Sequence, residues 1–303
     1  MKKLSIARQD FTCEQDFMRV NDFLSETYRL YKCLHNWDCA RWTFNRYGVH
    51  GKEELANHRE WEQYAQIWQT SEQQIVGVAH IEEPGEYFFQ VHPHYAYLEE
   101  EMLVWARETT RNKLVVHAFS SDVTRKALYK KHHAIKLAHT DYNRSLVLRD
   151  PFAPTRLPTG FQFIQLNRED SAACEKLSRL YSRIWPTSTY ISNGKIVSSL
   201  ATSPTFRKEL TFIAVAPNNN FAAYCIVWPD TLNRVGHFYP IGTDPDYAGM
   251  NLNQAVIEQA LNTLINIDYR QAYIGAYYDE EDEAVFQRLG FRALEIEEFF
   301  EIP

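Results

Sequence analysis

The chain has 303 residues, of which 45% are hydrophobic and 14% aromatic, and this composition excludes a disordered protein. Its formal net charge of −7 argues against a nucleic-acid-binding protein, because no basic stripe is available to displace counterions. No apolar run approaches the ~20 residues of a membrane-spanning helix, and the first residues do not form a signal peptide. Five cysteines without a C-x-x-C pair indicate reduced thiols, so we expect a cytoplasmic protein without a membrane segment.

In the first half of the chain, alternation and three-to-four spacing of apolar residues predict a mixture of strands and helices. The predicted strands are 3–8, 61–69, 75–82, 87–91 and 113–119, with a pair of strands at 135–148. The predicted helices are 12–34, a short one within 36–47 that buries Trp37 and Trp42, 98–110 and 122–133.

The second half gives a similar order of elements. The predicted strands are 161–166, 210–216, 221–228, 234–242, 271–278 and 291–302, the last of which ends the sheet. The predicted helices are 168–185, with Asp170 or Ser171 near its start, a second from about 193, a third from about 252, and 281–289.

Short matching segments indicate an internal duplication. V-H-P-H-Y-A at 91–96 matches T-D-P-D-Y-A at 243–248 in its Pro, Tyr and Ala, and A-L-Y at 127–129 corresponds to A-V-F at 284–286. Between the copies, residues 149–160 hold three prolines and one glycine, as a linker does. We therefore expect one domain at 1–150, a linker at 151–160 and a second domain at 161–303.

The segment 235–261 carries the strongest functional signal. An extended apolar stretch leads through a turn at Asp244 and Pro245, and a loop containing Gly249, into an amphipathic helix that starts near Leu252. The first N–H groups of such a helix lack intrahelical partners and lie at the positive end of the helix dipole. This arrangement predicts a site for an anion such as a phosphate.

Two motifs in this region resemble those of the GCN5-related N-acetyltransferases (GNAT). They are P-I-G-T-D-P-D-Y at 240–247 and E-A-V-F-Q-R-L-G-F-R-A-L-E at 283–295. The resemblance implies an α/β (α+β) fold of two tandem units, each a mixed, mostly antiparallel central sheet flanked by helices. It also implies an N-acetyltransferase that uses acetyl-CoA as cosubstrate and a primary amine of a small molecule or peptide as acceptor.

The resemblance assigns site residues in the second unit. Backbone groups of Ile241, Gly242 and Thr243 would bind the pantetheine arm. The pyrophosphate would meet a candidate phosphate loop, defined as residues 248–253: Ala248, Gly249, Met250, Asn251, Leu252 and Asn253. Asp279 and Phe286 occupy two further cofactor positions, and Tyr239 and Tyr278 are the candidate catalytic residues.

Departures from the family pattern keep a second hypothesis open. Asn251 and Asn253 stand at places where the family often has glycine, Tyr239 stands at the position of its glutamate base, and Phe286 at that of its tyrosine acid. A catalytically silent acyl-CoA- or metabolite-binding protein of the same fold is therefore the alternative. His237 and Tyr277 are further candidates for proton relay, and Arg270, Arg288 and Arg292 for neutralising phosphate.

The first unit is expected to be non-catalytic. Its loop after Tyr95 is shorter and has no glycine, and Glu99–Glu101 would repel a phosphate at the following helix. His80, His92, His94 and His117 lie in this unit without an accompanying carboxylate pattern, so we expect no metal site.

Overall fold

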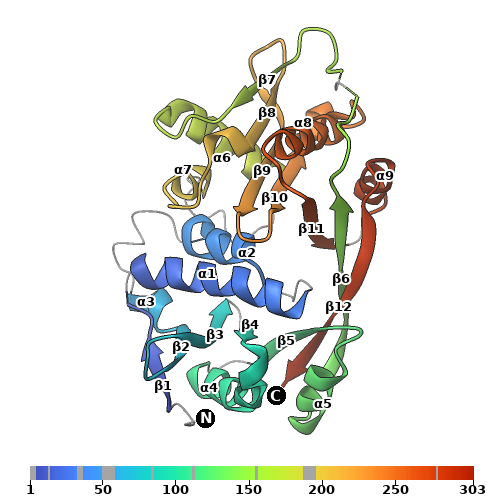
Figure 1. Ribbon diagram of the computed structural model, residues 1–303. Coiled ribbons are helices and arrows are strands. Elements are labelled where there is room, and N and C mark those ends of the chain that lie inside the picture. Colours follow the sequence, from blue (N-terminus) through green and yellow to red (C-terminus); the bar gives the residue numbers. More distant parts are fainter. Residues whose placement is uncertain are drawn as a thin grey trace. The chain divides into compact units, whose positions relative to one another are not determined.

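The computed structural model describes residues 5–12, 14–32, 37–49, 59–82, 85–110, 113–153, 156–186, 196–277 and 279–303 (Figure 1). The fold is mixed α/β, with helices flanking mostly antiparallel strands. It divides into two compact units. Unit 1 comprises Met1–Cys39, Asn57–Tyr142 and Glu295–Pro303, and unit 2 comprises Ala40–Ala56 and Asn143–Leu294.

Unit 1 contains strands in the order β1-β2-β3-β4-β5-β12-β6. Met102, Leu103 and Ala106 of helix α4 form its core together with strand residues such as Phe89 and Val116. Its elements are β1 (Ile6–Asp10), α1 (Glu14–Tyr31), α3 (Arg59–Glu62), β2 (Ala65–Thr70), β3 (Ile75–Glu82), β4 (Glu86–Val91), the 3₁₀ helix η3 (Pro93–Leu98), α4 (Glu99–Thr109), β5 (Leu114–Phe119), α5 (Val123–Lys131), the first part of β6 (Ile135–Val147) and most of β12 (Arg292–Ile302).

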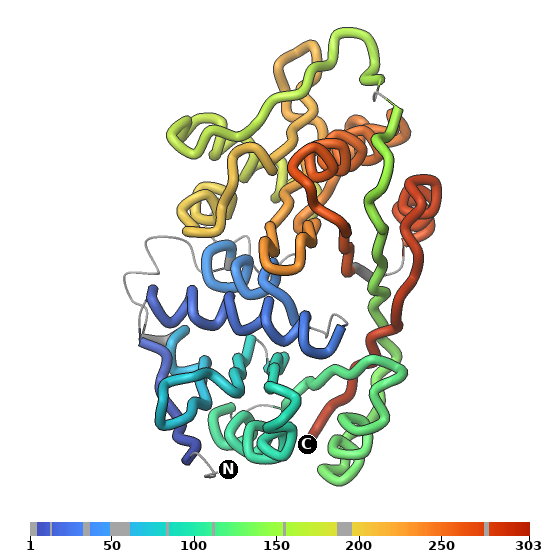
Figure 2. Tube along the Cα trace, viewed as in Figure 1, coloured from blue at the N-terminus to red at the C-terminus, as the bar shows by residue number. Residues whose placement is uncertain are grey.

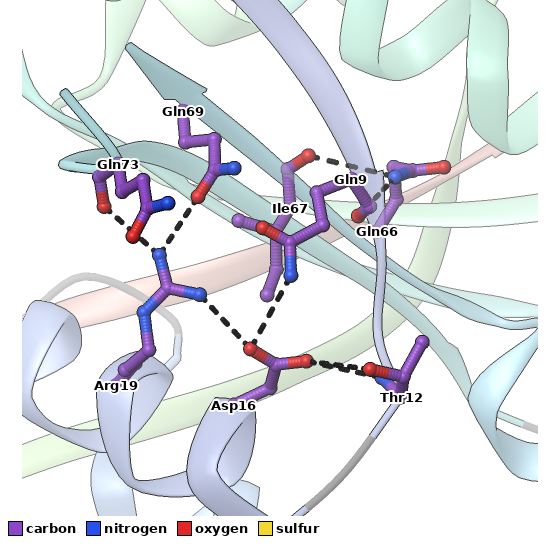
Figure 3. A network of polar contacts seen from close by, with 8 residues as sticks. All are labelled: Gln9, Thr12, Asp16, Arg19, Gln66, Ile67, Gln69 and Gln73. Carbon is purple, nitrogen blue, oxygen red and sulfur yellow. Dashed lines mark hydrogen bonds and ion pairs between the residues drawn. The ribbon is translucent and has the colours of Figure 1, made fainter. Parts of the chain in front are cut away.

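A polar network ties the first turns of α1 to the β1–β2 region (Figure 3). The buried Asp16 carboxylate accepts hydrogen bonds from the N–H and hydroxyl of Thr12, at 3.1 and 3.3 Å. Arg19 donates to Asp16 at 2.9 Å and also to Gln69 Oε1 and the Gln73 carbonyl, at 2.8 and 2.9 Å. These charge-assisted bonds fix where α1 starts against the strands of unit 1.

Unit 2 contains strands in the order β6-β11-β10-β9-β8-β7. Its elements are α2 (Cys39–Phe44), the π-helical turn η1 (Asn45–Val49), the last part of β6, β7 (Gln162–Gln165), α6 (Ser171–Ile184), α7 (Ile196–Leu200), η5 (Lys208–Leu210), β8 (Thr211–Val215), β9 (Phe221–Asp230), β10 (Val235–Thr243), η6 (Pro245–Tyr247), α8 (Leu252–Asn266), β11 (Gln271–Tyr277) and α9 (Glu280–Arg288).

Helices α8 and α6 cover opposite faces of the unit 2 strands. Cys225 of β9 belongs to the apolar core that contains α8 residues such as Val256 and Leu264. Its neighbour Tyr224 instead contacts Trp185, at the end of α6, with ring centroids 6.3 Å apart. Because successive residues of a strand point to opposite faces, each helix packs on its own side of β9.

Most predicted elements are present, and the helix from Leu252 is confirmed. Asp170 caps α6, as expected, by accepting the N–H of Ala173 at 3.0 Å. Cys39, Cys174 and Cys225 are buried free thiols, whereas Cys13 and Cys33 lie outside the described residues. Within the described ranges, no helix combines the length and apolar character needed to cross a bilayer.

Two strand predictions were wrong. Residues 135–147 form one 13-residue strand rather than a pair, because Asn143 Oδ1 and the Arg144 guanidinium find side-chain partners in the extended conformation. The last strand, β12, does not end the sheet but lies between β5 and β6, and its residues Glu297–Ile302 pair antiparallel with β5 (Figure 2). Its alternating acidic and apolar residues suit a strand with two paired neighbours as well as an edge strand, so composition alone does not distinguish them.

Candidate cofactor-binding site

Strands β10 and β11 of unit 2 are parallel but remain paired only at their start. The register joins Val235 to Gln271, Gly236 to Ala272, and His237 to Tyr273. Beyond this last pair, which we call the vertex, β10 continues to Thr243 and β11 to Tyr277 without further pairing between them. The edge of β10 that faces β11 therefore has no strand partner beyond the vertex, and the backbone groups of Ile241–Thr243 on that edge can bond a ligand, whereas the Tyr239 carbonyl already accepts Trp228 Nε1 at 2.6 Å.

The predicted pantetheine residues lie on this part of β10. The other edge of β10 pairs with β9, with an irregularity between Phe238 and Ile241 that includes the cis Tyr239–Pro240 peptide bond. Ile241 and Thr243 are partly buried, and Gly242 is packed so closely that a Cβ there would lie 2.9 Å from Ile184. The Thr243 hydroxyl is buried and has no hydrogen-bond partner.

A rigid turn joins β10 to the candidate phosphate loop. The Asp244 carboxylate accepts the N–H of Asp246 at 3.0 Å and two hydrogen bonds from Arg183 of α6, at 2.8 and 2.9 Å. Burial opposes the charge on Asp244, but its hydrogen bonds with Arg183 and the Asp246 backbone outweigh this and lower its pKa. The turn thus fixes the direction in which the chain leaves β10.

The candidate phosphate loop leaves the start of α8 open. Ala248, Gly249 and Met250 are exposed. Gly249 has φ of +75°, and a Cβ there would meet no atom within 4 Å. Asn251 is the N-cap in a left-handed conformation, φ 55° and ψ 26°, and its side chain makes no capping bond. The first N–H groups of α8 therefore have no cap from Asn251, which fits an anion bound at this helix start.

Asn253, the second residue of α8, links this helix to α9. Its Nδ2 donates to Asp282 Oδ1 at 2.7 Å, while its own Oδ1 is buried without a partner. Burial and the charge of Asp279 raise the pKa of Asp282. Arg288 of α9 brings a positive charge to the same turn, because its Nε donates to Gln254 Oε1 at 3.2 Å. By contrast, Arg270 pairs with Asp268, with its Nε 3.0 Å from Oδ1.

The remaining predicted site residues are Asp279, Phe286, Tyr239 and Tyr278. Asp279 caps α9 by accepting the N–H groups of Glu281 and Asp282, at 3.0 and 3.1 Å. Phe286 is 4% exposed and belongs to the core that contains α8. Tyr239 is half-buried, and its ring packs edge-on against Phe44 at 4.7 Å. Tyr278 lies outside the described residues.

Sequence analysis missed a polar pair at the vertex. The Tyr273 hydroxyl donates to Asn143 Oδ1, and the Asn143 Nδ2 is buried without a partner. The ring of Tyr273 also lies 5.6 Å from that of His237, its partner in the ladder. Asn143 comes from β6, more than a hundred residues away in sequence, and lies in no motif, so only the strand pairing reveals it.

Unit 1 also contains two parallel strands that pair over a short stretch, but the helix that follows the first of them starts differently from α8. β4 and β5 are parallel and pair only through Glu86–Val115 and Tyr87–Val116. At the first turn of α4, the buried Glu99 lies 3.5 Å from Nε of Arg125, which is itself 3% exposed. Burial raises the pKa of Glu99 despite the nearby guanidinium. A carboxylate of the chain itself therefore occupies the first turn of this helix.

The ring of His117 in unit 1 contacts two carboxylates. His117 lies between two carboxylates, with Nδ1 3.0 Å from Glu297 and Nε2 3.4 Å from Glu86. Across the ranges that the structure describes, no group of three or more His, Cys, Asp or Glu residues is arranged to hold a metal ion.

Neither a protein-family model nor a curated protein sequence matches this chain, but solved structures do. A tandem GNAT protein from the clavulanic acid biosynthesis pathway superposes with a TM-score of 0.67 at 14% identity, over 98% of both chains. The GCN5-related N-acetyltransferase from Sphaerobacter thermophilus gives 0.62 at 11% identity, over 98% of this chain and 95% of that one.

Saccharomyces cerevisiae N-myristoyltransferase, solved with bound myristoyl-CoA, gives a TM-score of 0.59 at 12% identity, over 98% of this chain and 79% of that one. Together these similarities identify the fold as a two-unit GNAT-like fold. The sequence prediction of tandem GNAT-like architecture is thereby confirmed.

Proposed function

We propose that unit 2 binds acetyl-CoA and transfers its acetyl group to a primary amine of a small molecule or peptide. One observation carries this proposal: β10 and β11 are no longer paired after the vertex, and β10 then leads through the turn at Asp244 to a helix start without a side-chain cap. The open strand edge suits the amide-containing pantetheine arm, and the helix start suits the pyrophosphate. GNAT proteins and a myristoyl-CoA complex among the similar structures support the choice of an acyl-CoA.

Each part of the site would bind one part of the cofactor. Backbone groups of Ile241, Gly242 and Thr243 would bind the pantetheine, and the unpaired Thr243 hydroxyl would gain a partner. Residues 248–253 would meet the pyrophosphate, with Arg288 supplying positive charge near Gln254. When bound, acetyl-CoA supplies an activated acyl group on a thioester.

The protein would contribute mainly positioning to the reaction. Holding an amine and a thioester together in the right geometry is worth more than acid–base assistance, which typically gives ~10²–10⁴-fold. Phe286 has no proton to give. A CoA thiol has a pKa near that of an ordinary thiol, ~8.5, so it leaves without a proton donor. Tyr239 and Tyr278 remain the candidate proton-relay residues.

The alternative is an acyl-CoA- or metabolite-binding protein without turnover. Phe286 favours it, because a phenylalanine at the place of the family's tyrosine has no ionisable group. In this case the same strand edge and helix start would bind the cofactor, and no amine would be acetylated.

Calorimetric titration with acetyl-CoA, followed by assays of CoA release with a panel of amines, separates the two. Binding with amine-dependent CoA release supports the transferase, and binding alone supports the alternative. Gly249→Val, which forces a β-branched residue to φ +75°, should abolish measurable binding. The matched control is Gly290→Val, at φ +88° in the turn after α9, which should bind normally. Equal affinity of Gly249→Val and the wild type would contradict the site assignment.

A further inference from the structure

The vertex of unit 2 holds a hydrogen-bond donor that the fold leaves without an acceptor. Asn143 is 4% exposed, and its Nδ2 has no partner. Its Oδ1 is engaged by the Tyr273 hydroxyl, which fixes the orientation of the amide. Buried polar groups are nearly always paired in folded proteins, so this amide has the capacity to bond a group from outside the chain.

The orientation of Asn143 follows from the alternation of β6. Its neighbour Arg144 lies on the side of α9, where it contacts Glu283 at 2.6 Å and its guanidinium lies over the ring of Phe286. Asn143 therefore points to the other face of the sheet. There it lies over β11, because a Cβ on Gly275 would be 2.9 Å from its Oδ1. A larger residue at 275 would displace this amide.

The vertex is also where the reactive end of the cofactor would arrive. Thr243, which precedes the turn to the phosphate loop, and His237, at the vertex, are six residues apart on β10, a span of about 20 Å. An extended pantetheine arm has a comparable length. A molecule held at the start of α8 and lying along β10 thus brings its thioester to the region of Asn143, Tyr273 and His237.

We infer that the Asn143 side-chain amide donates a hydrogen bond to the thioester carbonyl oxygen, which makes Asn143 a catalytic residue. Tyr273 is the positioning residue that holds this amide. The inference rests on the proposed function and adds a charge-stabilising group to it. A donor placed where negative charge develops stabilises the transition state more than the ground state.

The reaction then proceeds by direct attack. The nitrogen of the neutral amine forms a bond to the carbonyl carbon, and the carbonyl electron pair moves to the oxygen that Asn143 bonds. Collapse of this intermediate re-forms the C=O bond and breaks the C–S bond, so sulfur leaves with its electron pair. The proton lost by the nitrogen ends on the CoA sulfur, and the products are the amide and free CoA.

The test uses Asn143→Leu, which has nearly the same shape without the amide, and Tyr273→Phe, which keeps the ring without the hydroxyl. We expect kcat to fall by about 10²–10³-fold in Asn143→Leu, the usual effect of losing one oxyanion donor, with KM for acetyl-CoA little changed. Tyr273→Phe should lower kcat by about tenfold, because the amide is then less well held. The matched control is Asn262→Leu, which removes an amide that bonds the Phe152 backbone and neither Asn143 nor Tyr273.

A measurement without turnover accompanies the kinetics. The infrared carbonyl band of acetyl-CoA labelled with ¹³C at the carbonyl should shift to lower frequency on binding to the wild type and to Asn262→Leu. The shift should be lost in Asn143→Leu and reduced in Tyr273→Phe. If acetyl-CoA binds but the band is the same in wild type and Asn143→Leu, this inference is overturned while the proposed function stands. If the wild type does not bind acetyl-CoA, both are overturned. Should Asn143→Leu not fold, the band and kcat of Tyr273→Phe decide in the same way.

Discussion

Units 1 and 2 share a backbone arrangement but have different side chains at the start of the helix that follows it. In each, two parallel strands pair over two or three residues and then separate, and the first of them leads to a helix. In unit 1 that helix starts with Glu99, which is buried against Arg125. In unit 2 it starts after Asn251, whose side chain makes no capping bond. The difference lies in charge, since the strand arrangement is shared.

Two units with a similar strand arrangement therefore differ in the side chains that they place at the helix start. Arg125 bonds Gln90 Oε1 at 3.2 Å and its guanidinium lies 4.2 Å from the Phe89 ring centroid, so the cation is used entirely inside unit 1. A phosphate at this helix start would have to displace Glu99 and compete for Arg125. Unit 2 keeps its comparable cation, Arg288, on the surface. We therefore expect one acetyl-CoA per chain, in unit 2.

The largest expected effect comes from breaking the ion pair between Glu99 and Arg125 in unit 1. Arg125→Ala leaves Glu99 buried without its partner, and we expect the free energy of unfolding to fall by about 3–5 kcal/mol. Urea denaturation measures this change. The double variant Glu99→Leu/Arg125→Met should recover much of the loss, because an apolar pair carries no desolvation penalty. If Arg125→Ala is as stable as the wild type, Glu99 and Arg125 do not form a buried ion pair at the start of α4.

The second effect concerns charge at the helix start of unit 2. Asn251→Asp keeps a residue type that tolerates the left-handed conformation and adds a negative charge at the positive end of α8. The helix should gain about 0.3–1 kcal/mol of stability. Acetyl-CoA affinity should fall on the order of tenfold, since the carboxylate occupies the field that attracts the pyrophosphate. Thermal unfolding and calorimetry thus change in opposite directions; parallel changes would place the phosphate elsewhere.

The resemblance of two motifs implied the tandem GNAT-like fold, and local sequence patterns predicted most of its elements. The turn at Asp244, the helix from Leu252 and the cap at Asp170 all depend on residues close together in the chain. The position of β12 between β5 and β6 depends on pairing across more than 170 residues. Local periodicity does not report such distant pairing.

The same distinction applies to the candidate site. The loop 248–253 could be proposed from sequence, because a strand, a turn and a helix follow one another there. The pairing of Asn143 with Tyr273 could not, because it joins strands from the two halves of the chain. The burial of Phe286 and the capping by Asp279 also become visible only in three dimensions.

A smaller effect tests which arginine serves the candidate phosphate loop. Arg288→Gln removes the cation next to Gln254, and we expect acetyl-CoA affinity to fall about threefold, as for other exposed charge pairs. The loss should shrink as salt is raised, because exposed charges are screened. Arg270→Gln is the control, since this arginine pairs with Asp268 instead. Calorimetry at two salt concentrations measures both; equal losses in the two variants would indicate a non-specific charge effect.

The smallest effect concerns Asp282, the carboxylate that bonds Asn253 in the first turn of α8. Burial, and then the charge of Asp279, raise its pKa above the ordinary value of 3.8, so folding favours its protonated form. Between the two pKa values the folded state binds more protons than the unfolded state. Stability therefore falls as pH rises from 3.8 through the folded pKa. Asp282→Asn should remove this loss and be more stable than the wild type at pH 7.

The same substitution should increase acetyl-CoA affinity by about twofold at pH 7, because it removes a negative charge close to the proposed pyrophosphate position. The gain should disappear at low pH, where Asp282 of the wild type is protonated. Glu281→Gln is the matched control: it neutralises a carboxylate one residue earlier in α9 that is exposed. Calorimetry across the acidic range measures the ratio of affinities. A ratio that stays constant with pH, or an equal gain in Glu281→Gln, would mean that Asp282 does not face the bound phosphate. The charges at the helix start of unit 2 would then not explain why it, and not unit 1, binds the phosphate.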